Sequence, residues 1–250
     1  MDTLTGRAKI SGRFPGKTTR NRPAKCLRGI SAMALCGVYG DLSASMPQSQ
    51  SQSRHPAPGA RIILIRHGQP AIALRPRTSH REFHAYMDAY DAAGLDPASL
   101  PPREIVDLVR ELAQVFTSGK PRAHESARLL APQAELIIDP LFAEAPLASP
   151  RIPLLRMTVA KWAVLARLLW HAGQTQGIEN YPRARARAAA AADILTARVM
   201  AGGAVALVAH GYFNAMIGRQ LRRRGWSRSG SHQVRYWNAV IYDWKKGNAA

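Results

Sequence analysis

The sequence predicts an α/β fold, a three-layer α/β/α sandwich around a mostly parallel sheet. Two short aliphatic runs, residues 62–65 and 205–209, end abruptly at polar residues and glycine, which is typical of buried parallel strands. Segments with helical periodicity alternate with strands, and this alternation indicates crossover connections. The length of 250 residues and the hydrophobic fraction of 46% allow one domain with a sizeable core.

The first 59 residues differ from the rest of the chain. They lack sustained hydrophobic periodicity and contain a low-complexity run of Gln and Ser at 48–53. We expect a disordered basic N-terminal extension, residues 1–59, followed by the folded domain, residues 60–250. Two other interpretations stay open. One is a leader peptide, because basic residues precede the apolar-leaning segment 29–39; the other is a wrongly assigned start, with Met46 as the true one.

The first elements follow from apolar periodicity and from the residues that end each run. Apolar residues at three- and four-residue spacing, with acidic residues in the first half, predict an amphipathic helix at 102–115. The other elements expected up to residue 153 are a strand at 61–65, a helix at 81–93, a turn at 117–121, a helix from 122 to 130, a strand at 136–138 and a Pro-rich loop at 139–153.

The later elements alternate in the same way. They are helices at 158–171 and 183–200, a strand at 205–209, a helix at 212–223 and a strand at 240–244. Gly202 and Gly203 break the second of these helices. Ligands of open α/β sheets lie beyond the carboxyl ends of the strands, so the residues after 61–65 and 205–209 are the first to consider for chemistry.

The formal net charge of +19 raises the question of nucleic-acid binding. Residues 1–60 carry nine Lys and Arg against two Asp, a net +7, and the remaining +12 is spread over helices, loops and the short run 222–224. The sequence contains no basic motif interleaved with aromatic residues. We therefore do not expect nucleic-acid binding as the main function, since a basic surface also suits small anionic partners.

Cysteine and hydropathy patterns exclude several other classes. Cys26 and Cys36 both precede the first strand, so the expected domain has no disulfide framework and no thiolate metal site. His80 and His84 have the spacing of metal ligands on a helix, but a solvated helix face or a substrate-side loop is the expected role. No apolar stretch approaches the ~20 residues that cross a bilayer. We expect a cytoplasmic protein without membrane association.

Three motifs follow one another along the chain. They are Arg66-His67-Gly68 after the first strand, the segment 117–127 with the sequence TSGKPRAHESA, and His210-Gly211 after a later strand. In this order they resemble the histidine phosphatase superfamily, which has the phosphoglycerate mutase-like fold, over a stretch from about residue 61 to residue 244. The resemblance implies hydrolysis of a phosphomonoester through a phosphohistidine, with no metal or other cofactor, on a phosphorylated small molecule or a phosphoprotein.

By this resemblance His67 is the nucleophile, and Arg66, Arg122 and His210 bind the phosphoryl group. Residue chemistry agrees with these roles. A pKa near 6.5 leaves an imidazole partly deprotonated at neutral pH. Guanidinium groups match phosphate oxygens bidentately, and Arg122 lies near an expected helix start, where an anion is favoured. His210 also counts among the catalytic residues, as a donor to a phosphoryl oxygen.

The proton donor is less clearly marked. The resemblance implies a glutamate after the third strand, and Glu144 has that place. Glu179, or the absence of a dedicated acid, stays open as an alternative. Glu125 has the place of a structural glutamate. Ser118 is a further phosphate contact or, as an equal alternative, the cap of its turn.

Two departures from the family pattern bear on the reaction. Gln69 and Pro70 stand where many relatives have a polar residue and then Thr or Ser, and the asparagine expected a few residues later is missing from 71–77. Both count against a mutase. A phosphotransferase or mutase using the same histidine, and a catalytically weak protein that holds a phosphorylated partner, remain the alternatives. Asn214 could face the site. Four tryptophans, at 162, 170, 226 and 237, are expected to pack in the core or an interface rather than stack on a substrate.

Overall fold

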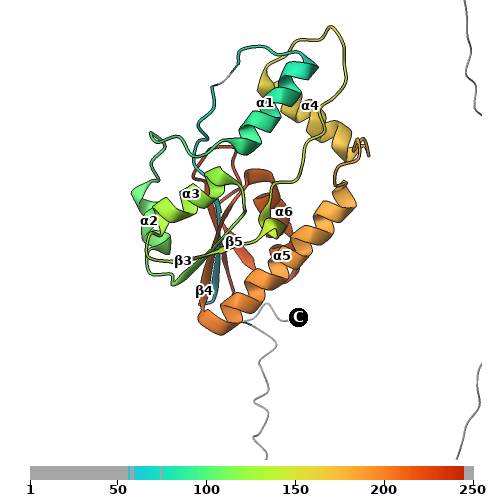
Figure 1. Cartoon of the computed structure of the whole chain (residues 1–250). Helices are drawn as coiled ribbons and strands as arrows, with labels where there is room; N and C mark the ends of the chain where they lie inside the picture. Colours follow the sequence, from blue (N-terminus) through green and yellow to red (C-terminus); the bar gives the residue numbers. More distant parts are fainter. Residues whose placement is uncertain (1–55, 57–58, 74, 245–250) are drawn as a thin grey trace, which may run out of the picture. The chain divides into compact units, whose positions relative to one another are not determined.

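The protein is described here by a computed structural model (Figure 1), which covers residues 56, 59–73 and 75–244. The expected disordered extension, 1–59, lies outside these residues apart from positions 56 and 59. The described elements are, in chain order, β1 (Arg61–Arg66), α1 (His80–Ala92), α2 (Arg103–Val109), β2 (Gln114–Thr117), α3 (Pro121–Leu130), β3 (Glu135–Ile138), the 3₁₀ turn η1 (Pro140–Phe142), α4 (Val159–His171), α5 (Tyr181–Gly202), β4 (Ala204–Ala209), α6 (Gly211–Arg223), β5 (Ser227–Ser229) and β6 (Ala239–Asp243).

These elements form one six-stranded sheet with the order β3-β2-β4-β1-β6-β5. The first four strands in that order are parallel to one another, β6 is antiparallel to β1, and β5 is antiparallel to β6. β1 and β4 are central neighbours in exact register, from Arg61 opposite Ala204 to Arg66 opposite Ala209. The predicted mostly parallel α/β architecture is therefore confirmed.

Alternating residues of β1 face two separate hydrophobic cores. Ile62 and Leu64 pack in the core beneath α5 and α6, while Ile63 and Ile65 pack against α2 and α3. All four side chains are at most 1% exposed, and each contributes roughly 1.5–3 kcal/mol through burial. Figure 1 shows the two helical layers on opposite faces of the sheet. The four tryptophans expected to pack, at 162, 170, 226 and 237, are all buried.

Helices α1 and α4 form a pair beyond the ends of the strands (Figure 1). Phe83 on α1 stacks on Trp162 of α4, with ring centroids 5.9 Å apart. The Trp162 Nε1–H donates to the carbonyl of Thr78 at 2.8 Å. A capping box between Ser79 and Glu82 starts α1. These contacts fix α1 at the edge of the sheet where the parallel strands end.

One expectation for the elements was wrong, and one strand was missed. The helix predicted at 102–115 ends at Val109, and Val115 belongs to β2. Val115 and Phe116 pack in opposite cores, and β2 pairs with strands on both sides; this pairing outweighs the continuing helical periodicity. Strand β5 was missed because its residues, Ser-Arg-Ser, are polar and it lies at the edge of the sheet.

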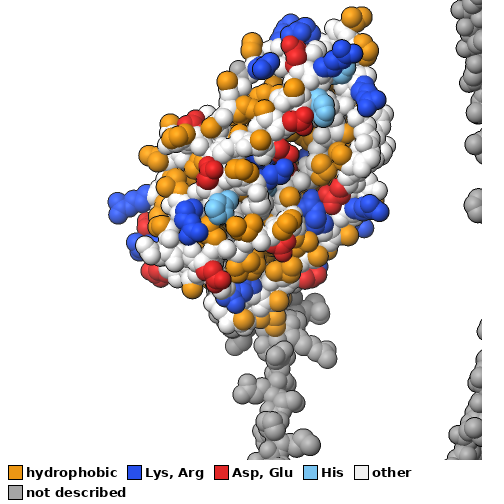
Figure 2. All heavy atoms as spheres, viewed as in Figure 1, with side chains coloured by type: hydrophobic (Ala, Val, Ile, Leu, Met, Phe, Trp, Pro, Cys, Tyr) orange, Lys and Arg blue, Asp and Glu red, His pale blue; other side chains and the backbone are white. Residues whose placement is uncertain are grey.

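Charged and hydrophobic side chains are mixed on the surface that Figure 2 shows. On the face drawn in Figure 2, Lys and Arg side chains are interspersed with acidic and hydrophobic ones and do not gather into one patch. Within the described part of the chain, no helix is long and apolar enough to cross a membrane.

Candidate active site

Two histidines meet just beyond the carboxyl ends of the central strands. β1 and β4 end side by side, so His67 and His210 follow at the same level, and the His67 N–H donates to the Ala209 carbonyl at 2.9 Å. Their rings lie edge to face with centroids 5.2 Å apart. His67 is 2% exposed and His210 is fully buried. The structure thus brings together two residues that are far apart in the sequence, as the strand ends predicted.

Hydrogen bonding leaves the Nε2 atom of His67 with its lone pair. Nδ1 lies 2.7 Å from the Gly68 carbonyl, which can only accept, so Nδ1 carries the proton. Nε2 accepts from Arg122 Nε at 3.4 Å. Burial lowers the pKa of His67 to about 3, with smaller contributions from Arg122 and Arg66, against the hydrogen bond to Gly68. His67 is therefore neutral at physiological pH, as a nitrogen nucleophile must be.

Position 68 is too crowded for any side chain, and only glycine fits there. A Cβ at this position would overlap the Trp237 indole and the Leu95 side chain. The Gly68 N–H donates to Ser126 Oγ at 2.9 Å, and Ser126 Oγ donates to the Arg122 carbonyl at 2.6 Å. The turn that carries His67 is thereby joined to the helix that carries Arg122.

Arg122 is the second residue of α3 and is 1% exposed. Its Nη1 donates to the Tyr90 carbonyl at 2.8 Å, and its Nη2 lies 3.3 Å from a carboxylate oxygen of Asp91. The guanidinium also lies over the Tyr90 ring, 4.4 Å from the centroid. Because Tyr90 and Asp91 are on α1, that helix fixes the direction in which Arg122 points.

Arg66 is held by the segment that precedes β6. Its Nη1 donates to the Val234 carbonyl, and its guanidinium lies over the Tyr236 ring, 4.7 Å from the centroid. A Cβ at Gly211 would lie 3.3 Å from Arg66 Nε, so this glycine leaves space for the guanidinium at the start of α6. The Nε atom is buried and has no hydrogen-bond partner among the described residues.

His210 also has a buried nitrogen without a hydrogen-bond partner among the described residues. Its Nε2 lies 2.7 Å from Ser118 Oγ, while its Nδ1 is buried without a partner in the described part of the chain. Burial lowers its pKa well below 6.5, and the neighbouring His67 and Arg122 act in the same direction. Ser118 also accepts from the Lys120 N–H at 3.4 Å. Ser118 therefore contacts His210 and its own turn, which agrees with a positioning and capping role.

The Glu144 carboxylate lies at the N-terminus of α6, the helix that begins directly after His210. Its carboxylate accepts from the Phe213 N–H at 2.9 Å, the Tyr212 N–H at 3.3 Å and the Ala145 N–H at 2.9 Å. Burial raises the pKa of Glu144, although Arg167 and these hydrogen bonds act against the rise. A raised pKa is what a proton donor near neutral pH requires.

The rival acid, Glu179, is engaged elsewhere. It forms a bidentate pair with Arg187, with Nε–Oε1 and Nη2–Oε2 distances of 2.9 and 2.7 Å. Arg187 Nη1 also donates to the carbonyls of Leu141 and Ala143, next to Glu144. The Glu179–Arg187 pair therefore holds the loop that carries Glu144, and both carboxylate oxygens of Glu179 are engaged by Arg187.

The other residues singled out in the sequence have contacts of their own. Glu125 accepts from the Leu95 N–H at 2.6 Å, in line with its expected structural role. Asn214 donates to the Ile65 carbonyl at 3.0 Å and so fastens α6 to β1. His84 lies 3.9 Å from Asp88 on the outside of α1. Among the described residues, no group of three or more His, Cys, Asp or Glu is placed to hold a metal.

Several contacts of the site were not marked by the sequence. The rings of Tyr90 and Tyr236 lie 6.5 and 5.9 Å from that of His67, measured between centroids. Both tyrosines come from segments outside the three motifs, and no local spacing singles them out. A pocket of about 360 Å³ is lined by Tyr90, Arg122 and Glu144, among others, and it joins one expected anion-binding group to the expected acid. Neither His67 nor His210 is among its lining residues.

Comparison with known proteins gives a family match. The sequence profile described as Histidine phosphatase superfamily (branch 1) matches residues 62–250. None of the curated protein sequences compared with the chain matches it significantly.

Solved structures give weaker similarities. The protein of open reading frame Rv3214 from Mycobacterium tuberculosis has 16% identity and a TM-score of 0.48, over 75% of this chain and 93% of that chain. A mycobacterial glucosyl-3-phosphoglycerate phosphatase complexed with VO3 has 18% identity and a TM-score of 0.47, over 73% and 90%. A mutant phosphoserine phosphatase from Entamoeba histolytica, in complex with phosphoserine, has 13% identity and a TM-score of 0.44, over 72% and 89%.

Proposed function

The chain belongs to branch 1 of the histidine phosphatase superfamily and is a phosphatase of that family; on this premise we propose that it hydrolyses phosphomonoesters through a phosphohistidine on His67. His67 Nε2 attacks phosphorus, and the bond to the leaving oxygen breaks as Glu144 protonates that oxygen. Water then attacks the phosphohistidine, with the Glu144 carboxylate as general base, and releases inorganic phosphate and neutral His67.

The observation that carries this proposal is the set of groups around His67 Nε2. The imidazole is neutral, and its Nε2 lone pair points toward the buried Arg122, from which it accepts a long hydrogen bond of 3.4 Å. Arg66 Nε and His210 Nδ1 are buried and without partners among the described residues. Buried polar atoms of this kind are rare and costly. A phosphoryl group bonded to Nε2 would supply acceptor oxygens for the Arg66 Nε–H and for His210 Nδ1 in the tautomer that carries its proton there, and the cationic side chains would balance its charge.

Glu144 is the proposed acid because its pKa is raised and because it shares a pocket with Arg122. The pocket volume of about 360 Å³ lies within the range of sites for small ligands. We accordingly favour a phosphorylated small molecule as substrate. We also propose that residues 60–250 form the catalytic domain and that residues 1–59 take no part in the reaction.

The test is hydrolysis of p-nitrophenyl phosphate by the full chain and by His67→Ala. We expect the variant to lose activity by roughly 10³-fold or more, with an unchanged circular dichroism spectrum. His124→Ala, on the partly exposed part of α3, is the matched control and should retain activity. Brief mixing with ³²P-labelled substrate should trap a phosphoenzyme that is labile to acid and stable to alkali in the parent protein alone. Full activity of His67→Ala would refute the proposal.

The same experiment separates hydrolysis from phosphotransfer. A phosphatase releases inorganic phosphate at the rate at which nitrophenol appears. A transferase or mutase would retain the phosphoenzyme and pass the phosphoryl group to an added alcohol acceptor.

A further inference from the structure

A second pocket, of about 560 Å³, adjoins the candidate active site. It lies between the first turns of α1 and the loop segments 147–151 and 176–178. Four of its lining residues are arginines or histidines: His80, Arg81, His84 and Arg151. No acidic side chain is among its lining residues. Leu147 lines both this pocket and the pocket that contains Arg122 and Glu144.

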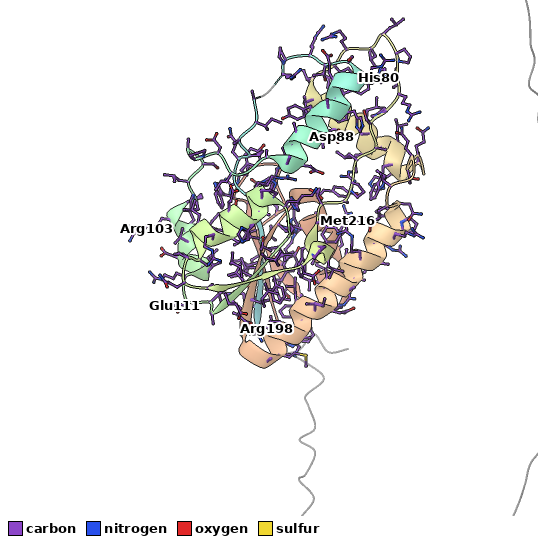
Figure 3. The ribbon with its side chains drawn as sticks, viewed as in Figure 1. His80, Asp88, Arg103, Glu111, Arg198 and Met216 are labelled. Carbon is purple, nitrogen blue, oxygen red and sulfur yellow. The ribbon has the colours of Figure 1, made fainter. Side chains whose placement is uncertain are left out.

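One face of α1 runs along both pockets. His80, His84, Met87 and Asp91 are spaced by four, three and four residues and therefore share a face of the helix. The first two line the second pocket, and the last two line the pocket beside Arg122. The labels in Figure 3 mark His80 at the N-terminal end of α1 and Asp88 further along it. With a rise of 1.5 Å per residue, the second pocket lies roughly 10–15 Å from the part of α1 that contacts Arg122.

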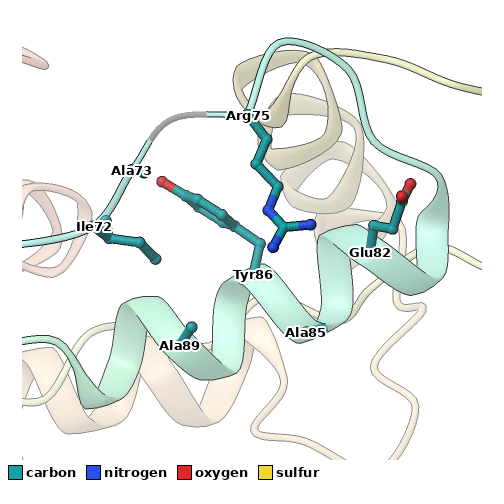
Figure 4. A pocket seen from close by; sticks show the side chains of 7 residues that line it. All are labelled: Ile72, Ala73, Arg75, Glu82, Ala85, Tyr86 and Ala89. Carbon is teal, nitrogen blue, oxygen red and sulfur yellow. The ribbon is translucent and has the colours of Figure 1, made fainter.

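The opposite face of α1 lines neither the second pocket nor the pocket beside Arg122. Glu82 and Tyr86 line a smaller pocket of about 180 Å³ together with the segment that follows β1 (Figure 4). Glu82 also accepts from the Ser79 N–H at 2.6 Å and pairs with Arg156 at 3.2 Å. Glu82, the acidic residue nearest the start of α1, therefore lies away from the second pocket.

Hydrogen bonds join the walls of the second pocket. Ser149 Oγ donates to the His80 carbonyl at 3.1 Å, and Gln176 Nε2 donates to the Ser149 carbonyl at 3.1 Å. The three chain segments are therefore fixed with respect to one another. Among the described residues, neither Arg81 nor Arg151 takes part in an ion pair, and both are exposed.

We propose that this pocket binds a second anionic group of the substrate. The substrate would then be a phosphomonoester with a further phosphate or carboxylate on the order of 10–15 Å from the scissile phosphoryl group, because this is the approximate separation along α1 between the second pocket and the residues that contact Arg122. Arg81 and Arg151 pair with that group, and His80 adds a polar contact. This inference rests on the proposed function, since it takes the phosphoryl group beside His67 as its reference point.

The experiment compares two families of substrates of increasing chain length. The first contains alkane-α,ω-diol bisphosphates and ω-carboxyalkyl phosphates, and the second contains the matching ω-hydroxyalkyl phosphates. We expect a lower KM for the doubly anionic compounds at one range of lengths, by on the order of fivefold to tenfold for two exposed charge pairs. The bisphosphate and carboxylate arms show which second anion is preferred.

The double variant Arg81→Ala/Arg151→Ala should abolish this preference while kcat and KM for p-nitrophenyl phosphate stay within about twofold. Arg103→Ala/Arg128→Ala, which removes the same charge from α2 and α3, is the matched control and should keep the preference. A preference that is absent at every length, that survives in the double variant, or that is lost equally in the control would overturn the inference.

Binding separates this inference from the proposed function. Calorimetry with the His67→Ala protein measures the affinity of the bisphosphate and of its hydroxyl counterpart without turnover. Tighter binding of the bisphosphate that depends on Arg81 and Arg151 supports the second anion site even if the parent protein hydrolyses nothing. Equal binding of the two compounds refutes the site even if hydrolysis proceeds through His67.

Discussion

The Nε2 atom of His67 lies 3.4 Å from Nε of Arg122, and each residue is held in place by a different part of the fold. The ring of His67 is oriented by the turn after β1, and the guanidinium by α1. A group bonded to Nε2 must therefore come into contact with Arg122.

Arg122→Lys should lower kcat/KM for p-nitrophenyl phosphate roughly 10²-fold, because a single ammonium group cannot reproduce two parallel hydrogen bonds from a rigid fork. The affinity for orthovanadate should fall in parallel. Arg128→Lys, an exposed position later in the same helix, should change neither quantity. If Arg122→Lys also changed neither quantity, Arg122 would act only through its charge.

Glu144→Gln should discriminate between substrates by their leaving groups. Nitrophenolate leaves without a proton, whereas an alkoxide needs one, so kcat/KM should fall roughly 10²-fold or more for alkyl phosphates and much less for p-nitrophenyl phosphate. In Glu179→Gln, which weakens the pair with Arg187, both substrates should be affected to a similar degree. A selective loss in Glu179→Gln would reassign the acid.

Acid should destabilise the fold through the buried histidines. The pKa of His67 is about 3 in the folded state and near 6.5 in the unfolded chain, so only the unfolded chain takes up this proton between those values. The free energy of unfolding should therefore fall as the pH drops below about 6.5, by roughly 2–3 kcal/mol at pH 4.5 for this one histidine, and stay unaffected above.

Urea denaturation of the parent protein and of His67→Gln at pH 4.5 and 7.5 measures this contribution. The variant should lose less stability on acidification than the parent, and His124→Gln should behave like the parent. The opposing effect of Glu144, whose pKa is raised, cancels in this comparison because both proteins contain it. Identical acid dependence of the parent and His67→Gln would contradict the buried, neutral state of His67.

Gly68→Ala tests the crowding around the nucleophile. The added Cβ would overlap Trp237 and Leu95, and overpacking of this kind costs about 1–3 kcal/mol. Activity should also fall, because the turn holding His67 has to move. Gly119→Ala is the control, since its Cβ would meet nothing nearer than Ile138 at 3.9 Å; both its stability and its activity should stay close to those of the parent.

Much of the architecture was predictable because the signals that mark it are local. An aliphatic run closed by Arg66 and His67 identifies β1, and the run before His210 identifies β4. Parallel strands end at the same edge of a sheet, so the meeting of the two histidine rings followed from these runs. Strand β2 was hidden, because its two core-facing apolar residues continue the helical spacing of the preceding segment.

The surroundings of the site could not be predicted in the same way. Tyr90, Tyr236 and Arg187 act through contacts between segments far apart in the chain, and no motif or spacing marks them. The role of Glu179 was open for the same reason. Only its bidentate contact with Arg187 shows that its carboxylate is already engaged.

The in-register pairing of β1 with β4 has a consequence for how such a chain can diversify. The separation of the two imidazoles is set by a ladder of backbone hydrogen bonds and hardly at all by the residues that connect the strands. Insertions or deletions in the loops that follow α1 and α4 can thus enlarge, shrink or recharge the substrate pocket while the two imidazoles keep their spacing. New substrates become accessible to the same chemistry through changes in the connecting segments alone.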